Sequence, residues 1–253
     1  MYIPEWSIAN SVAAAVSTIA IGVLVARELF PDTRLKYSKF NNNTSSSASR
    51  ETYISSYNGM LLIYTPSLAL SALFLMVSYK NYRMQFVSAA VFVHYLKRVL
   101  EVLFVHRYSG QCKLSDNILI SLSYSLFSLL VYKLASNVPN PSSKAMLLGA
   151  IIFLVGEYIN FYHHLILRDL RKDGSKEYKI PTGALFDYVW CPHYTGEIIT
   201  FIAIVLLTQH FLLLILQVGS GAYLVMRAYN TRKWYEDRFD TIPQRACLIP
   251  CIF

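Results

Sequence analysis

Long apolar segments recur along the chain and constrain its fold more than any other feature. They cover approximately residues 7–30, 59–78, 84–105, 118–136, 145–167 and 198–226. About 20 apolar residues span the hydrocarbon core of a bilayer, so each of the first five segments can cross a membrane once. The sixth is too long for one crossing, and we expect it to turn near Gln209 and His210 into two helices. The sequence therefore predicts an all-α integral membrane protein with seven transmembrane helices.

The composition supports a membrane protein and argues against a nucleic-acid-binding one. Hydrophobic residues make up 55% of the 253 residues and charged residues only 15%, with a mean hydropathy of +0.38. A net charge of +8 would suit nucleic acid in a soluble protein, but basic loops on the cytosolic side explain it in a membrane protein. We therefore expect no nucleic-acid partner, and the sequence does not indicate an oligomeric state.

Most of the basic residues fall in loops that share one face of a seven-helix arrangement. These loops follow the first, third and fifth helices, and the C-terminal tail joins them. The basic residues near the loops of the opposite face are only Lys80, Arg83 and Lys144. Because basic loops stay on the cytosolic side, we expect the tail in the cytosol and the N-terminus across the membrane.

The chain is expected to form a single membrane domain with its chemistry in the C-terminal two thirds. Residues 1–90 contain the first two helices and a flexible loop at 31–57, which includes the polar run Asn41–Ser49. Residues 91–253 contain the remaining helices, the polar groups within them and a C-terminal tail. We interpret this second part as the catalytic region.

Two polar segments interrupt the apolar helices of that region. The stretch Asp169–Glu197 is basic and aromatic, which suits either a loop ordered by a charged ligand or an ordinary solvated loop. The segment Arg227–Arg245 follows the last helix. Its cationic and aromatic residues include Arg227, Arg232, Lys233, Trp234 and Tyr235. Such residues suit a phosphate and a stacked ring, or alternatively an anionic lipid surface.

Two further clusters of polar residues lie inside predicted helices. The first contains His94, Tyr95, Arg98 and Glu101, and the second contains Glu157, Asn160, His163 and His164. Spacings of three and four place the members of each cluster on one side of a helix. Ionisable groups inside a membrane mark a functional site or a paired structural contact. No metal site is predicted, because no tight H-x-x-x-H or C-x-x-C pair accompanies the histidines.

An ordered set of motifs spans approximately residues 90–253. It consists of Asn160, Leu170-Arg171, Tyr178-x-Ile180-Pro181-x-Gly183-x-Leu185-Phe186, Cys191-Pro192-x-Tyr194-x-Gly196-Glu197, Arg227, Tyr235 and Leu248-Ile249-Pro250. This set resembles the steroid 5α-reductase family, which includes very-long-chain trans-2-enoyl-CoA reductases and polyprenol reductases. The resemblance implies a multi-pass enzyme of the endoplasmic reticulum membrane whose cytosolic loops close an NADPH pocket. It implies reduction of a carbon–carbon double bond conjugated to a carbonyl, in a lipid that enters from the bilayer.

The resemblance also implies roles for particular residues. Tyr95 is similar to a tyrosine that touches the substrate carbonyl, and Arg98 to its arginine neighbour, so both are catalytic candidates. The expected cofactor-binding residues are Asn160, Arg171, Tyr178, His193, Glu197, Arg227 and Tyr235. Hydride addition builds negative charge on the carbonyl oxygen, and a hydrogen bond donated by Tyr95 would stabilise that charge.

Departures from the family pattern leave the substrate open. Steroid reductases carry a Gln-Glu pair before a proline in their second helix, whereas Ile63-Tyr64-Thr65 precedes Pro66 here. The run His94–Arg107 resembles the enoyl-CoA reductases more closely, although those enzymes carry an additional ubiquitin-like N-terminal domain. We expect a 3-oxo-Δ4-steroid as substrate, with a trans-2-enoyl-CoA as the alternative. An S-adenosylmethionine-dependent membrane methyltransferase is the alternative from another class of enzyme.

Overall fold

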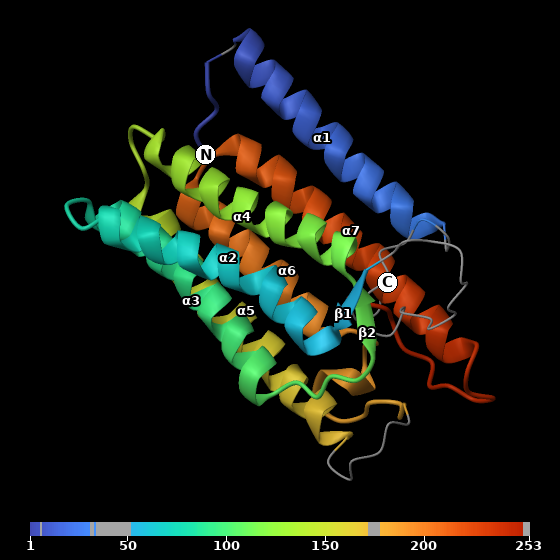
Figure 1. The fold of residues 1–253 in the computed structure, drawn as a ribbon. Coiled ribbons are helices and arrows are strands. Elements are labelled where there is room, and N and C mark those ends of the chain that lie inside the picture. Colours follow the sequence, from blue (N-terminus) through green and yellow to red (C-terminus); the bar gives the residue numbers. More distant parts are fainter. Residues whose placement is uncertain (6, 31–32, 34–51, 172–177, 250–253) are drawn as a thin grey trace. The chain divides into compact units, whose positions relative to one another are not determined.

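The computed structural model contains seven α-helices and one pair of short strands in the part of the chain that it describes (Figure 1). The described residues are 1–5, 7–30, 33, 52–171 and 178–249. The helices are α1 (Ile8–Leu29), α2 (Ser56–Val77), α3 (Tyr82–Phe104), α4 (Leu114–Ser136), α5 (Ser143–Asp169), α6 (Pro192–Thr208) and α7 (Phe211–Glu236). Each of the seven predicted helical segments is therefore a helix, including the two that the sixth apolar segment was expected to form.

Four of these helices, α2, α4, α5 and α7, are long and apolar enough to cross a membrane. Helix α6 is also apolar but has only 17 residues. These lengths and compositions agree with a multi-pass membrane protein, and the full set of seven crossings stays a prediction.

The chain divides into two compact units. Unit 1 comprises Met1–Arg34 and Val138–Phe253, and unit 2 comprises Leu35–Asn137. Unit 1 contains α1, α5, α6 and α7, whereas unit 2 contains α2, α3 and α4.

Unit 2 is a three-helix arrangement in which α2 packs against both α3 and α4 (Figure 1). Strand β1 (Tyr53–Ser55) runs antiparallel to β2 (Gln111–Lys113), which follows α3. The expectation of a loop over 31–57 was therefore wrong for its last residues. Helix α2 begins at Ser56 because the Ser55 side chain accepts a hydrogen bond from the Asn58 amide and caps the helix. The serine-rich run Asn41–Ser49 lies outside the described residues.

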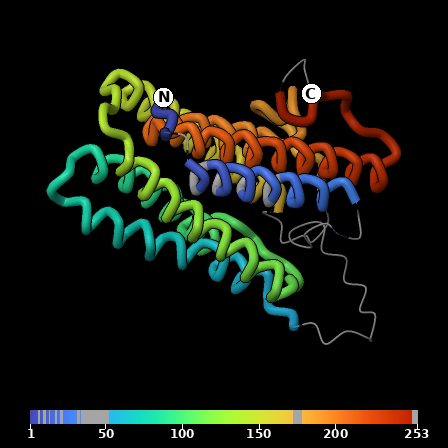
Figure 2. The backbone as a smooth tube through the Cα atoms, turned by 90° about the horizontal axis from the view of Figure 1, so that it is seen from above, coloured from blue at the N-terminus to red at the C-terminus, as the bar shows by residue number. Residues whose placement is uncertain are grey.

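Unit 1 is built from two helix pairs. Helices α5 and α6 approach so closely that a Cβ at Gly156 would lie 2.8 Å from the Gly196 carbonyl oxygen. Helix α1 lies along α7, as Figure 2 shows in blue and red. In lipid, helices associate through close backbone packing and interhelical hydrogen bonds rather than through a hydrophobic driving force.

One end of unit 1 is held together around the turn between α6 and α7. Gln209 occupies the left-handed region there, with φ of 60°. Its side-chain oxygen accepts from the Ser142 amide at 2.8 Å, and its side-chain nitrogen donates to the Ser142 carbonyl at 3.0 Å. Tyr2 pairs with His210 through a backbone bridge. The N-terminus, the start of α5 and this turn therefore lie at the same end of unit 1, in agreement with the predicted helix directions.

Two predicted loops proved partly helical. Helix α6 begins at Pro192 and not near Ile198, because proline suits the first turn of a helix, where its missing N–H has no partner to lose. The motif Cys191–Glu197 therefore forms the start of α6. Helix α7 continues to Glu236, so the residues from Arg227 to Tyr235 are its last turns and not an extended tail.

Candidate functional site

The two catalytic candidates lie in unit 2, on α3. Tyr95 is 3% exposed, and its hydroxyl donates a long hydrogen bond of 3.4 Å to the Tyr124 carbonyl oxygen. Its ring lies against Tyr124 and edge-on to His94, with centroids 5.9 and 5.1 Å apart. Tyr95 is thus a buried phenol that lies between aromatic rings.

Arg98 is tied to two other groups. One terminal nitrogen donates to the Glu101 carboxylate at 2.6 Å, and the other donates to the Tyr64 hydroxyl at 2.5 Å. The guanidinium also lies 4.8 Å from the centroid of the Tyr64 ring. Because Tyr64 stacks on Tyr124, the rings of Tyr64 and Tyr95 both contact Tyr124. Arg98 thus joins the cluster through Tyr64.

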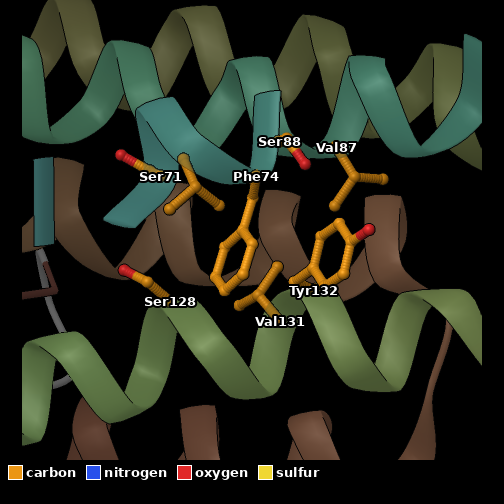
Figure 3. Close-up of a pocket in the computed structure, with 8 residues that line it drawn as sticks. Ser71, Phe74, Val87, Ser88, Ser128, Val131 and Tyr132 are labelled. Carbon is orange, nitrogen blue, oxygen red and sulfur yellow. The ribbon is translucent and has the colours of Figure 1, made fainter. Parts of the chain in front are cut away.

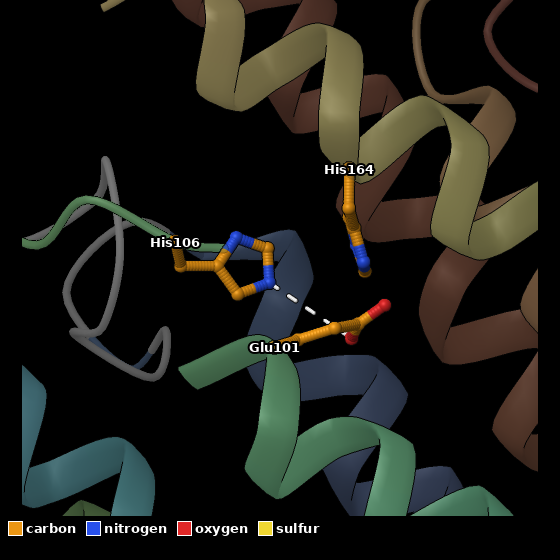
Figure 4. Close-up of side chains that lie close together, drawn as sticks. All are labelled: Glu101, His106 and His164. Atoms are coloured by element: carbon orange, nitrogen blue, oxygen red, sulfur yellow. Dashed lines mark ion pairs between the residues drawn. The ribbon is translucent and has the colours of Figure 1, made fainter. Parts of the chain in front are cut away.

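Glu101 is the charged centre of this cluster. It is 1% exposed, and Lys97 lies 3.7 Å from it in addition to Arg98. His106 Nε2 lies 4.0 Å from Oε2, the carboxylate oxygen that also accepts from Arg98 (Figure 4). Figure 4 also draws His164, which belongs to unit 1. Burial raises the pKa of the neighbouring Tyr108 hydroxyl above its usual range. The surrounding cations compensate the buried negative charge of Glu101.

A small cavity lies between the three helices of unit 2 (Figure 3). Its volume is only about 10 Å³, and it is lined by Ser71, Phe74, Val87, Ser88, Val91, Ser128, Val131 and Tyr132. Val91 lies one helical turn from Tyr95 on α3, and Ser128 lies one turn from Tyr124 on α4. Sites for drug-sized ligands usually exceed about 300 Å³, so this cavity is too small to be a substrate site by itself.

The cofactor candidates all lie in unit 1. Asn160 on α5 donates through its side-chain nitrogen to the His193 carbonyl oxygen at the start of α6, at 2.9 Å. The small residues Gly156 and Gly196 permit this bond by bringing the two helices together. Glu197 lies half-buried near the start of the same helix. The second predicted polar cluster and the C-P-x-Y motif are therefore brought together.

Tyr178 and Tyr235 belong to a group of aromatic rings, and Arg171 lies against one of these rings. The Arg171 guanidinium lies 5.1 Å from the centroid of the Tyr178 ring, which meets Trp234 edge-on. Tyr235 stacks on Trp190 with centroids 5.0 Å apart. Arg238 lies 4.0 Å over the Trp234 ring. Cations can bind the phosphates of a dinucleotide, and flat rings can stack on its bases, so these residues suit such a ligand by their chemistry.

Arg245 was not singled out from the sequence but is central to this region. Its guanidinium lies 3.8 Å from the centroid of the Trp190 ring and donates to the carbonyl oxygens of Pro181 and Phe186. Burial lowers the pKa of Arg245 below its usual value. Arg245 therefore holds the segment before α6 against the C-terminal residues, where Val189 and Ala246 form a backbone bridge. A basic residue beside the closing Leu-Ile-Pro motif was the signal available in the sequence.

His163 of α5 has a structural role. His163 Nε2 accepts from the Leu185 amide at 3.3 Å, so Nδ1 carries the proton and donates to the Ile159 carbonyl at 2.6 Å. This arrangement anchors the 3-10 turn Ala184–Asp187 to α5. Because both ring nitrogens are engaged, His163 does not offer a free metal ligand.

Arg227 lies in a different setting from the one that the sequence suggested. It is 1% exposed, and its guanidinium donates to Glu28 of α1 at 3.0 Å. Tyr223 and Asn230 donate to the same carboxylate. Nothing in the local pattern of the sequence pointed to this pair, since the two residues are 199 positions apart.

Comparison with known proteins connects this arrangement to enzymes. The model of the 3-oxo-5-alpha-steroid 4-dehydrogenase family matches residues 117–253. A very-long-chain enoyl-CoA reductase of Dictyostelium discoideum is 32% identical over 204 residues, which cover 78% of this chain and 68% of that protein. The 3-oxo-5-alpha-steroid 4-dehydrogenase 2 of Homo sapiens is 39% identical over 107 residues, or 42% of each chain. A steroid 5-alpha-reductase of Gossypium hirsutum is 38% identical over 109 residues.

The match to the enoyl-CoA reductase must extend into unit 2, because unit 1 is shorter than 78% of the chain. The matches to the steroid enzymes cover less than half of those proteins. Together with the family model, which covers more than half of the chain, these similarities show that the chain belongs to the steroid 5α-reductase family.

Proposed function

We propose that the protein is a membrane-embedded reductase that uses NADPH to reduce a carbon–carbon double bond conjugated to a carbonyl in a lipid. The observation that carries this proposal is the buried Tyr95 phenol within an aromatic cluster, in a chain of this family. The named relatives are two reductases and one steroid dehydrogenase by name, and none is a methyltransferase, so the methyltransferase alternative is not favoured.

The proposed catalytic step depends on the carbonyl oxygen of the substrate. NADPH supplies the hydride when it is bound. Tyr95 donates a hydrogen bond to the carbonyl oxygen and stabilises the negative charge that develops there. Arg98 follows Tyr95 by three residues on α3, and Tyr64 and Glu101 hold its guanidinium in place. The aromatic rings exclude water, which strengthens each of these interactions.

The cofactor is proposed to bind in unit 1. Arg171 and the rings of Tyr178, Trp234 and Tyr235 suit the phosphates and flat rings of NADPH by their chemistry. Asn160 and His193, joined by a hydrogen bond, complete the proposed set together with Glu197. Arg227, which was expected in this set from the sequence, is buried against Glu28 and is assigned no direct contact with the cofactor. We further propose that the enzyme resides in the endoplasmic reticulum membrane, and that its substrate enters from the bilayer.

A 3-oxo-Δ4-steroid is the first candidate substrate, and a trans-2-enoyl-CoA is the second. The second is favoured by one observation: the similarity to an enoyl-CoA reductase extends into the unit that contains Tyr95. Purified protein with NADPH should be mixed separately with progesterone and with hexadecenoyl-CoA, and the absorbance of the nicotinamide should be followed. Oxidation with one substrate alone identifies the class. No oxidation with either, in protein that binds NADPH, contradicts both substrate proposals.

A further inference from the structure

The end of α1 carries one buried carboxylate that the predicted site does not include. Glu28 is 1% exposed, whereas several aliphatic residues of α1, among them Ile8, Val16 and Ile19, are each more than half exposed. It is the one fully buried side chain among the residues of α1 whose side chains are described. Outward aliphatic groups suit lipid and give α1 no preferred register against a neighbouring helix. The hydrogen bonds of Glu28 give α1 a specific polar contact with α7.

Glu28 gathers three residues from one face of α7. Its Oε1 atom accepts from Arg227 Nη1 at 3.0 Å and from the Tyr223 hydroxyl at 3.2 Å. Asn230 Nδ2 donates to Oε2 at 3.2 Å and to the Glu28 backbone carbonyl at 2.9 Å. Spacings of four and three place these donors on one side of α7. Hydrogen bonds of this kind fix both the rotation and the height of α7 against α1.

The same face of α7 continues toward the proposed cofactor region. Thr231, Trp234 and Tyr235 follow Arg227 at helical spacing, and all are buried. Trp234 meets Tyr178 edge-on, and Tyr235 stacks on Trp190. A rotation of α7 would therefore move both aromatic side chains away from their partners. The orientation set at Glu28 is transmitted to these rings through two helical turns.

We propose that Glu28 is a positioning residue for the cofactor region, which it orients through Arg227 and Asn230. This inference rests on the proposed binding of NADPH in unit 1. A carboxylate repels an anionic ligand, so a purely electrostatic role predicts tighter NADPH binding when Glu28 is removed. A positioning role predicts weaker binding. The sign of the change therefore separates the two.

The test compares Glu28→Gln and Glu28→Ala with Glu236→Gln, which breaks an exposed ion pair to Arg232 on the same helix. For each purified variant, thermal stability, the Kd for NADPH and kcat at saturating cofactor are measured. Glu28→Ala should raise the Kd about tenfold or more, which a change of about 1.4 kcal/mol produces, while kcat stays within about twofold. Glu28→Gln should fall between Glu28→Ala and wild type, and Glu236→Gln should bind NADPH as wild type does.

A double variant separates positioning from simple loss of stability. Glu28→Leu with Arg227→Met replaces the buried pair by apolar groups, which commonly restores stability because no uncompensated charge remains. We expect its stability to recover and its NADPH affinity to stay low. Recovery of affinity together with stability would overturn the proposal. An unchanged or lower Kd for NADPH in folded Glu28→Ala would also overturn it. If Glu28→Ala does not fold, the Kd of Asn230→Ala is measured instead, with the same outcomes expected. Wild-type protein that fails to bind NADPH would instead contradict the proposed function.

Discussion

The contact between α5 and α6 gives a graded test of how unit 1 is packed. A Cβ at Gly156 would lie 2.5 Å from Thr200 Oγ1 and 2.7 Å from the Thr200 amide nitrogen. A Cβ at Gly149 would meet its nearest neighbours at 3.1 Å, and one at Gly221 of α7 would meet nothing within 4 Å. The three glycines therefore differ in the space available for one methyl group, while the substitution to alanine is chemically the same.

The expected changes in stability follow from those distances. Overpacking a tight interior costs about 1–3 kcal/mol, and we expect Gly156→Ala at the upper end because backbone atoms obstruct it. Gly149→Ala should cost less, since its neighbours lie at 3.1 Å and need to move by only a few tenths of an ångström. Gly221→Ala should stabilise the protein by about 0.4–1 kcal/mol, because alanine restricts the unfolded chain and favours helix.

Thermal unfolding of the three variants in one detergent measures this order directly. The melting temperature should decrease from Gly221→Ala through wild type and Gly149→Ala to Gly156→Ala. NADPH affinity should fall only where α5 and α6 are forced apart, because the Asn160 bond to the His193 carbonyl spans that interface. A Gly156→Ala protein as stable as Gly221→Ala would refute the close approach of the two helices.

Four other predictions test the site and the topology. Tyr95→Phe should keep NADPH binding and lower the rate of single-turnover hydride transfer about a hundredfold or more, as loss of an oxyanion donor does; a wild-type rate would remove Tyr95 from the mechanism. Arg171→Ala should weaken NADPH binding about tenfold in an equilibrium titration, and equal affinities would exclude direct contact. A reporter after Phe253 should be cytosolic and one before Met1 should not, and both on one side would contradict the predicted crossings. Burial lowers the pKa of His210, whose Nδ1 accepts from the Leu212 amide, so melting temperature should fall below about pH 6.5 in wild type but much less in His210→Asn.

The sign of the His210 effect follows from proton binding. The folded chain keeps this ring neutral, whereas the unfolded chain protonates it near its ordinary pKa. Stability from the neutral ring is therefore complete above that pH and is lost as the pH falls below it. Asparagine at the same position can cap α7 without a titrating group.

Hydrophobic length was sufficient to locate every helix, but it misplaced the helix ends. The apolar runs end where polar residues begin, whereas a helix ends where its last backbone groups find other partners. Ser55 caps α2 before the apolar run starts, and Pro192 begins α6 inside a polar motif. Helix α7 continues beyond its apolar part because its polar residues are buried on one face.

Local spacing also predicted clusters but not their partners. The spacing of Arg98 and Glu101 on one helix left a paired structural contact open as an alternative, and the structure has that ion pair at 2.6 Å. It gave no sign that Tyr64 of another helix accepts from Arg98. Likewise, Arg227 was expected to face a ligand, and its partner Glu28 lies at the other end of the chain. Contacts between distant segments depend on the packing of helices, which periodicity does not encode.

The buried polar contacts follow a common physical rule. Aliphatic faces in lipid gain little by meeting one another, so they leave the rotation of a helix poorly determined. A directional bond removes that freedom, and each helix pair of unit 1 has one: Asn160 for α5 and α6, and Glu28 for α1 and α7. Both bonds lead to residues that we propose for the cofactor. The polar residues inside these helices therefore have two consequences at once, since the bonds that orient the helices also place the side chains that would bind the ligand.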